Sequence, residues 1–123
     1  MANILVVDDD PIVRRMLSLM LQRCGHTTVP AERGQEALEY LHEEPFDLVI
    51  TDLDMPEMNG IDLLKQVRTD AGLNGLPVIM LTASAEDQDD VRARAEGVSA
   101  FLTKPAGSHE LADTVTRVLE PAG

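Results

Sequence analysis

The stretch Ile4-Leu5-Val6-Val7-Asp8-Asp9-Asp10-Pro11, near the start of the 123-residue chain, joins an apolar run to a row of acids. Four consecutive apolar residues are typical of a strand that is buried on both faces, as in a parallel sheet. Asp10 is a favoured N-cap residue, and Pro11 suits the first position of a helix. The stretch therefore predicts a strand, a short acidic turn and a helix.

The same alternation of apolar run and helical segment repeats along the chain. Further strands are expected at 26–31, 46–51, 77–81 and 99–102, and further helices at 35–43, about 61–67, 86–96 and 109–119. Such alternation predicts an α/β protein with a parallel sheet covered on both faces. Pro30 removes a ladder donor, so the second strand belongs at an edge. We therefore expect a flavodoxin-like (βα)5 three-layer sandwich with strand order 2-1-3-4-5, forming one domain over residues 1–123 without an output domain.

The first helix is expected to bury one apolar stripe. At helical spacing the stripe contains Val13, Met16, Leu17, Met20, Leu21 and Cys24. Cys24 is the only cysteine in the chain, so it is interpreted as a core residue and not as a reactive thiol. Gly25 is expected to end the helix.

Composition and charge exclude several classes of function. Apolar residues make up 44% of the chain and aromatic residues only 2%, which indicates a folded domain with an aliphatic core. The formal net charge of −12 would repel a phosphate backbone, so direct nucleic-acid binding is not expected. No apolar run is long enough for a signal peptide or a membrane span, and the cytoplasm is the predicted location.

Polar residues follow four of the predicted strands. Asp8 and Asp9 follow the first strand, and the third, fourth and fifth are followed by Asp52, Thr82 and Lys104. In a sheet of this kind the carboxyl ends of the strands meet in one crevice. Three carboxylates held close together repel one another, and a hard divalent cation relieves that repulsion. The sequence thus predicts a site for Mg²⁺, or for Mn²⁺ in its place, with Asp52 as the nucleophile that forms an aspartyl phosphate.

The chain closely resembles the receiver domains of two-component response regulators over nearly its whole length. The resemblance rests on the stretches 4–10, 47–56, 59–60, 77–83 and 103–105. It implies that Asp52 is the phosphoacceptor and that Asp8 and Asp9 hold the metal ion. It further implies that the backbone carbonyl of Asp54 is a metal ligand and that Thr82 and Lys104 contact the phosphoryl group.

The resemblance also implies how the signal would pass through the domain. Phe101 occupies an aromatic switch position, where the ring turns inward as Thr82 moves. The Lys104–Pro105 peptide is expected to be cis. A sensor histidine kinase or a phosphotransfer protein would donate the phosphoryl group, and a downstream protein would bind the surface of the fourth helix, fifth strand and fifth helix. Asp54 and Ser84 flank the expected path of the hydrolytic water.

Three alternatives to this switch remain at the level of sequence. Asp52-Leu53-Asp54 mimics the nucleophile motif of haloacid-dehalogenase phosphatases, although that motif usually follows the first strand. A flavin carrier of the same fold would need small and hydroxyl residues in place of the acids after the first strand. A constitutive interaction module would keep the motif without being phosphorylated. No turnover of an external substrate is expected from the receiver interpretation.

Overall fold

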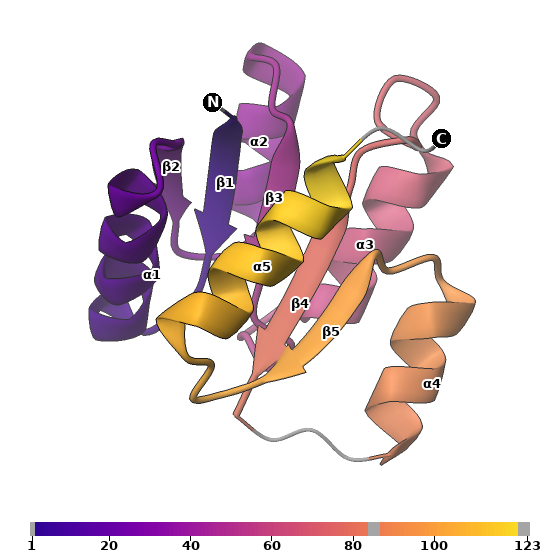
Figure 1. Cartoon of the computed structure of the whole chain (residues 1–123). Helices are drawn as coiled ribbons and strands as arrows, with labels where there is room; N and C mark the ends of the chain where they lie inside the picture. The colour runs from indigo at the N-terminus through magenta and orange to yellow at the C-terminus, as the bar shows by residue number, and fades with distance from the viewer. Residues whose placement is uncertain (1, 84–86, 121–123) are drawn as a thin grey trace.

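The computed structural model describes residues 2–83 and 87–120 and contains five strands that alternate with five helices. The strands form one parallel sheet in the order β2-β1-β3-β4-β5 (Figure 1), which confirms the predicted fold class and the edge position of β2. The elements are β1 (Asn3–Val7), α1 (Pro11–Arg23), β2 (Thr27–Ala31), α2 (Gly34–Glu43), β3 (Leu48–Thr51), α3 (Gly60–Thr69), β4 (Val78–Thr82), α4 (Asp87–Ala95), β5 (Ala100–Thr103) and α5 (Ser108–Leu119).

The helices cover both faces of the sheet, so the core has two halves. Along β1, alternate side chains face opposite ways: Leu5 and Val7 pack toward α2, α3 and α4, whereas Ile4 and Val6 pack toward α1 and α5. All four of these side chains are at most 1% exposed. Burial on both faces explains why this strand appears in the sequence as an unbroken apolar run.

The predicted apolar stripe of α1 is partly wrong. Leu17 and Leu21 are buried as predicted, but Met16 is 56% exposed and Cys24 is also exposed. Met16 precedes Leu17 directly and is therefore turned by about 100° away from the buried line of the helix. Cys24 is the C-cap residue, where the helical backbone has already ended, so the helical spacing no longer sets its direction.

The ends of the sheet strands differ slightly from the prediction. β3 begins at Leu48 and not at residue 46, whereas β4 and β5 extend one residue further, to Thr82 and Thr103, which pair with each other. Extension of β4 leaves Thr82 at the last position of the strand. Within the described residues, no helix combines the length and the apolar character that a membrane crossing requires.

Candidate functional site

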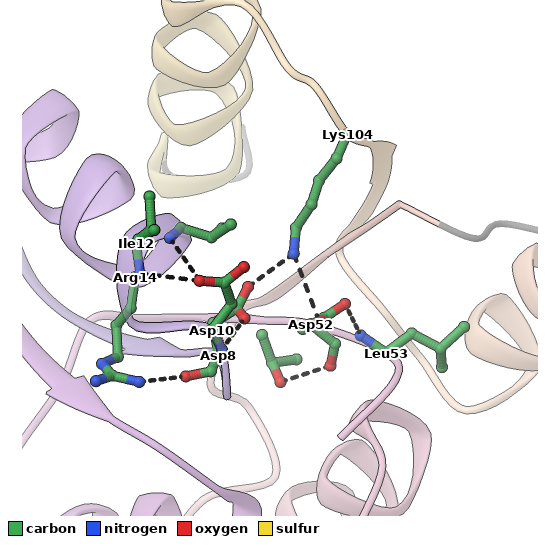
Figure 2. Close-up of polar contacts among 9 residues, drawn as sticks. Asp8, Asp10, Ile12, Arg14, Asp52, Leu53 and Lys104 are labelled. Carbon is green, nitrogen blue, oxygen red and sulfur yellow. Dashed lines mark hydrogen bonds and ion pairs between the residues drawn. The ribbon is translucent and has the colours of Figure 1, made fainter. Parts of the chain in front are cut away.

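Two neighbouring strands bring the central acids together. Val7, the last residue of β1, pairs with Thr51, the last residue of β3, so Asp8 and Asp52 follow at the same level. The backbone continues the ladder by one step, because the Asp52 N–H donates to the Val7 carbonyl at 3.0 Å. Both side chains lie at the carboxyl edge of the sheet (Figure 2). The predicted convergence of these two acids is therefore present in the structure.

Asp9 completes a cluster of three carboxylates. One oxygen from each of Asp8, Asp9 and Asp52 lies within 4.8 Å of the others. Asp8 is 1% and Asp52 8% exposed, whereas Asp9 is exposed. Clustered carboxylate oxygens are the ligands that Mg²⁺ prefers, and a partly exposed site leaves room for the waters that it retains. The donor set therefore fits a magnesium ion.

Lys104 reaches this cluster from the other end of the chain. Its Nζ donates to Asp8 Oδ2 at 2.7 Å and lies 3.5 Å from Asp52 Oδ2 (Figure 2). The Lys104 N–H is held by the Thr82 carbonyl at 2.8 Å, and the Lys104–Pro105 peptide is cis, as expected. The ammonium thus neutralises part of the charge of two carboxylates.

These contacts shift the protonation equilibria of the site. Burial raises the pKa of Asp52; Lys104 opposes this shift, and the charge of Asp8 adds to it. For Lys104, burial disfavours the ammonium, but the hydrogen bond and the charge of Asp8, together with the charge of Asp52, outweigh it and raise the pKa of Lys104. The site therefore keeps Lys104 charged and makes ionisation of Asp52 costly.

Hydrogen bonds from the two neighbouring residues fix the orientation of Asp52. Its Oδ1 accepts a hydrogen bond from the Leu53 N–H at 2.7 Å, and its carbonyl accepts one from the Thr51 hydroxyl at 2.9 Å. The second oxygen, Oδ2, faces Lys104 and the other acids. One carboxylate oxygen is thus anchored, while the other points into the cluster.

Asp10 has a separate, structural role. Its Oδ1 accepts from the backbone N–H groups of Ile12 and Val13 at 2.9 and 3.4 Å, which makes it the predicted N-cap of α1 (Figure 2). In turn, Asp8 Oδ1 accepts from the Asp10 N–H at 2.9 Å. The capping contacts direct Asp10 away from the cluster and help to hold the acidic turn.

Three further predicted site residues lie on or just after the strands β3, β4 and β5. Thr82 is 1% exposed at the end of β4, and Phe101 on β5 is half-buried against the core under α2, α3 and α4. The Asp54 side chain is exposed after β3. Ser84 lies outside the described residues. Sequence reasoning missed Arg14, whose guanidinium contacts the Asp8 carbonyl; its bond to the main chain leaves no motif in the sequence.

The protein has a doubly wound parallel sheet, with an acidic cluster at the carboxyl edge of its central strands. These features place it in the class of flavodoxin-like α/β proteins. Within that class, the model of the response regulator receiver domain matches residues 4–116. The chain belongs to this family of two-component signalling domains.

Named relatives agree with the family. The chain is 40% identical over 119 residues to the chemotaxis protein CheY of Pseudomonas aeruginosa, covering 96% of each protein. It is 42% identical to the transcriptional regulatory protein GlrR of Escherichia coli, covering 97% of this chain but 26% of that protein. The solved structure of Vibrio cholerae CheY4 superposes with a TM-score of 0.91 at 35% identity, covering 97% of this chain and 99% of the other. Receiver domains are signalling switches, and those of the CheY type interact with histidine kinases and downstream targets.

Proposed function

We propose that this receiver domain is a phosphorylation switch in which Asp52 accepts a phosphoryl group in a Mg²⁺-dependent step. The observation that supports this most directly is the meeting of three carboxylates and one ammonium at the carboxyl edge of the sheet. Each of these groups has a defined role in phosphoryl transfer, and the cluster has little use as a stabilising element because its carboxylates repel one another.

In the proposed mechanism, the Asp52 carboxylate attacks the phosphorus of a phosphohistidine. The bond from phosphorus to the imidazole nitrogen breaks as the bond from phosphorus to the Asp52 oxygen forms. Asp8, Asp9, Asp52 and the Asp54 carbonyl would hold Mg²⁺, or Mn²⁺ in its place. When bound, the ion neutralises charge on the phosphoryl oxygens and aligns them for transfer. Lys104 would then leave its present contacts and pair with a phosphoryl oxygen, as a compact point charge can.

Phosphorylation would bias the conformation of the part of the sheet formed by β4 and β5. The Thr82 hydroxyl would donate to a phosphoryl oxygen, and the Phe101 ring would turn further into the core. Because the Phe101 ring has no hydroxyl, this change would work through packing. The donor would be a sensor histidine kinase or a phosphotransfer protein, and a downstream protein would read the surface of α4, β5 and α5.

Family membership favours this function over two of the alternatives, because haloacid-dehalogenase phosphatases and flavin carriers belong to other families. The constitutive module remains as the second candidate. We expect no turnover of an external substrate, and the cytoplasm remains the predicted location.

Intact-mass spectrometry tests the proposal directly. Wild type and Asp52→Asn would be incubated with acetyl phosphate and Mg²⁺, with and without EDTA, and Asp54→Asn would serve as a second variant. We expect the mass of one phosphoryl group on wild type and on Asp54→Asn, lost with EDTA and in Asp52→Asn. An adduct that persists in Asp52→Asn would refute the assignment of the phosphoacceptor. Wild type that neither gains the adduct nor binds Mg²⁺ would favour the constitutive module.

A further inference from the structure

Arg14 reaches back from the first turn of α1 to the acidic turn. Its Nη1 donates to the carbonyl oxygen of Asp8 at 2.7 Å (Figure 2). Its Nη2 lies 3.8 Å from Glu32 Oε1, in the loop that follows β2. The Arg14 side chain is only 15% exposed, whereas that of Glu32 is 62% exposed, so the bond to the carbonyl is the shielded one. The guanidinium thus holds the end of β1 to α1.

The bonded carbonyl belongs to the peptide unit that joins Asp8 to Asp9. The Asp8 carboxylate has two other anchors, the Asp10 N–H and Lys104 Nζ. Within the described part of the chain, the exposed Asp9 side chain makes no hydrogen bond or ion pair. The direction of its carboxylate therefore depends on the backbone on either side of it. Arg14 fixes the preceding peptide and, through it, the position of Asp9.

A positive charge beside a cation site also has an opposing effect. The Arg14 charge alone would repel a divalent ion and weaken its binding. Fixing the peptide orientation would strengthen binding, because groups that hold metal ligands in place preserve affinity. The two effects have opposite signs, so removal of the guanidinium shows which one is larger.

We propose that Arg14 is a positioning residue for divalent-cation binding, in which its bond to the Asp8 carbonyl presents Asp9 to the ion. The inference rests on the proposed function, since it takes Asp8 and Asp9 to be metal ligands. It adds to that function a residue outside the cluster. The shielded bond to the carbonyl favours the positioning effect over the charge effect.

The neighbouring Arg15 provides a matched control. It lies on the same helix and is exposed, and among the described residues it has no hydrogen bond or ion pair. Arg14→Gln and Arg15→Gln each remove one positive charge, but only the first removes the bond to Asp8. Arg14→Lys keeps the charge and a donor while losing the forked geometry of the guanidinium.

Mg²⁺ affinity of the unphosphorylated protein is the readout. Amide shifts of Asp8, Asp9 and Leu53 would be followed by NMR during a titration with MgCl₂, after thermal unfolding has shown that each variant is folded. We expect Arg14→Gln to bind Mg²⁺ about 10-fold more weakly than wild type. Arg15→Gln is expected to stay within about two-fold of wild type, because the charge of an exposed side chain is screened. Arg14→Lys should fall between the two variants.

The outcomes separate this inference from the proposed function. Equal or tighter Mg²⁺ binding by Arg14→Gln, relative to Arg15→Gln, would overturn the positioning role. If Arg14→Gln does not fold, Arg14→Lys decides, and wild-type affinity in that variant would overturn the specific need for the guanidinium. Absence of Mg²⁺ binding in wild type would instead count against the proposed function itself.

Discussion

Asp52 carries its charge in surroundings that oppose ionisation. Burial raises the pKa of this carboxyl, and the Asp8 charge reinforces the shift against the attraction of Lys104. A phosphoacceptor must nevertheless be ionised to act as a nucleophile. The domain therefore holds an unfavourable negative charge that a bound cation would relieve.

This unfavourable charge predicts a pH-dependent effect of Asp52→Asn. The pKa of Asp52 is higher in the folded state than its ordinary value of 3.8. At pH values between the ordinary pKa and the folded pKa, the folded protein therefore binds more protons than the unfolded chain. Stability contributed by protonated Asp52 is thus present at low pH and lost as the pH rises through the folded pKa. Asp52→Asn should be more stable than wild type at neutral pH, by about 0.5–2 kcal/mol, the range for stabilising single substitutions.

Urea unfolding in metal-free buffer, repeated between about pH 4 and pH 8, measures this difference. The advantage of Asp52→Asn should grow with pH and then level off. Glu39→Gln removes the same charge from an exposed position of α2 and controls for net charge. A pH-independent difference, or one equal to that of Glu39→Gln, would contradict the expectation.

At the scale of elements, the turn after β3 is tied to the start of α3. The Gly60 N–H donates to the Leu53 carbonyl at 2.8 Å, and Gly60 is the first residue of α3. A Cβ atom at Gly60 would overlap the carbonyl oxygen of Asp52. The helix can approach the backbone of Asp52 this closely only because residue 60 has no side chain.

Gly60→Ala should therefore damage both stability and the site. We expect a loss of about 1–3 kcal/mol in the free energy of unfolding, the range for overpacking. The backbone of Asp52 would shift, so the phosphorylation rate should fall as well. Gly75→Ala is the control, because a Cβ there meets no atom within 4 Å. Urea unfolding of the two variants gives the comparison, and equal stabilities would contradict this account.

Arg68, near the end of α3, connects three segments close to the amino ends of β4 and β5. Its guanidinium donates to the Gly97 carbonyl at 3.0 and 2.8 Å, to Asn74 at 3.1 Å and to Leu76 at 2.6 Å. These carbonyls lie in the loop before β4 and in the turn after α4. Among the apolar residues of α4, only Ala93 is buried, so few apolar contacts hold this helix. The hydrogen bonds of Arg68, which we call the Arg68 clamp, are therefore a major attachment of α4 to the domain.

Arg68→Met should loosen the carboxyl end of α4. The loss of hydrogen bonds from a charged donor should lower the free energy of unfolding by about 2 kcal/mol. Hydrogen exchange at the amide of Val98, which donates to Ala93, should become faster. Arg92→Met is the control, because Arg92 is exposed and makes no contact of this kind among the described residues. Similar exchange rates in both variants would refute the clamp.

At the scale of the whole molecule, the sequence predicted those features that depend on periodicity. Unbroken apolar runs identified the buried strands, Pro30 identified the edge, and the strand ends identified Asp8, Asp52 and Lys104 as neighbours. The cis peptide followed from family resemblance alone.

Other features depend on tertiary geometry that periodicity does not contain. Cys24 was assigned to the core because its spacing fits the helix, but the helix had ended before it. The contacts of Arg14 and Arg68 could not be predicted from the sequence, because both side chains donate to backbone carbonyls, which every residue possesses. Contacts between side chains and the main chain can therefore be identified only from a structure.

Because the net charge is −12, cations can stabilise the folded protein in two ways, by screening and by specific binding. Any salt will screen repulsion across an acidic surface, whereas Mg²⁺ should also bind the cluster in the folded state only. At a concentration 100-fold above its Kd, such binding adds about 2.7 kcal/mol to the free energy of unfolding. Thermal unfolding in MgCl₂ should therefore occur at higher temperature than in NaCl of equal ionic strength. Asp9→Asn should lose this difference and Glu39→Gln should keep it; an equal response to the two salts in wild type would mean that the carboxylates hold no ion.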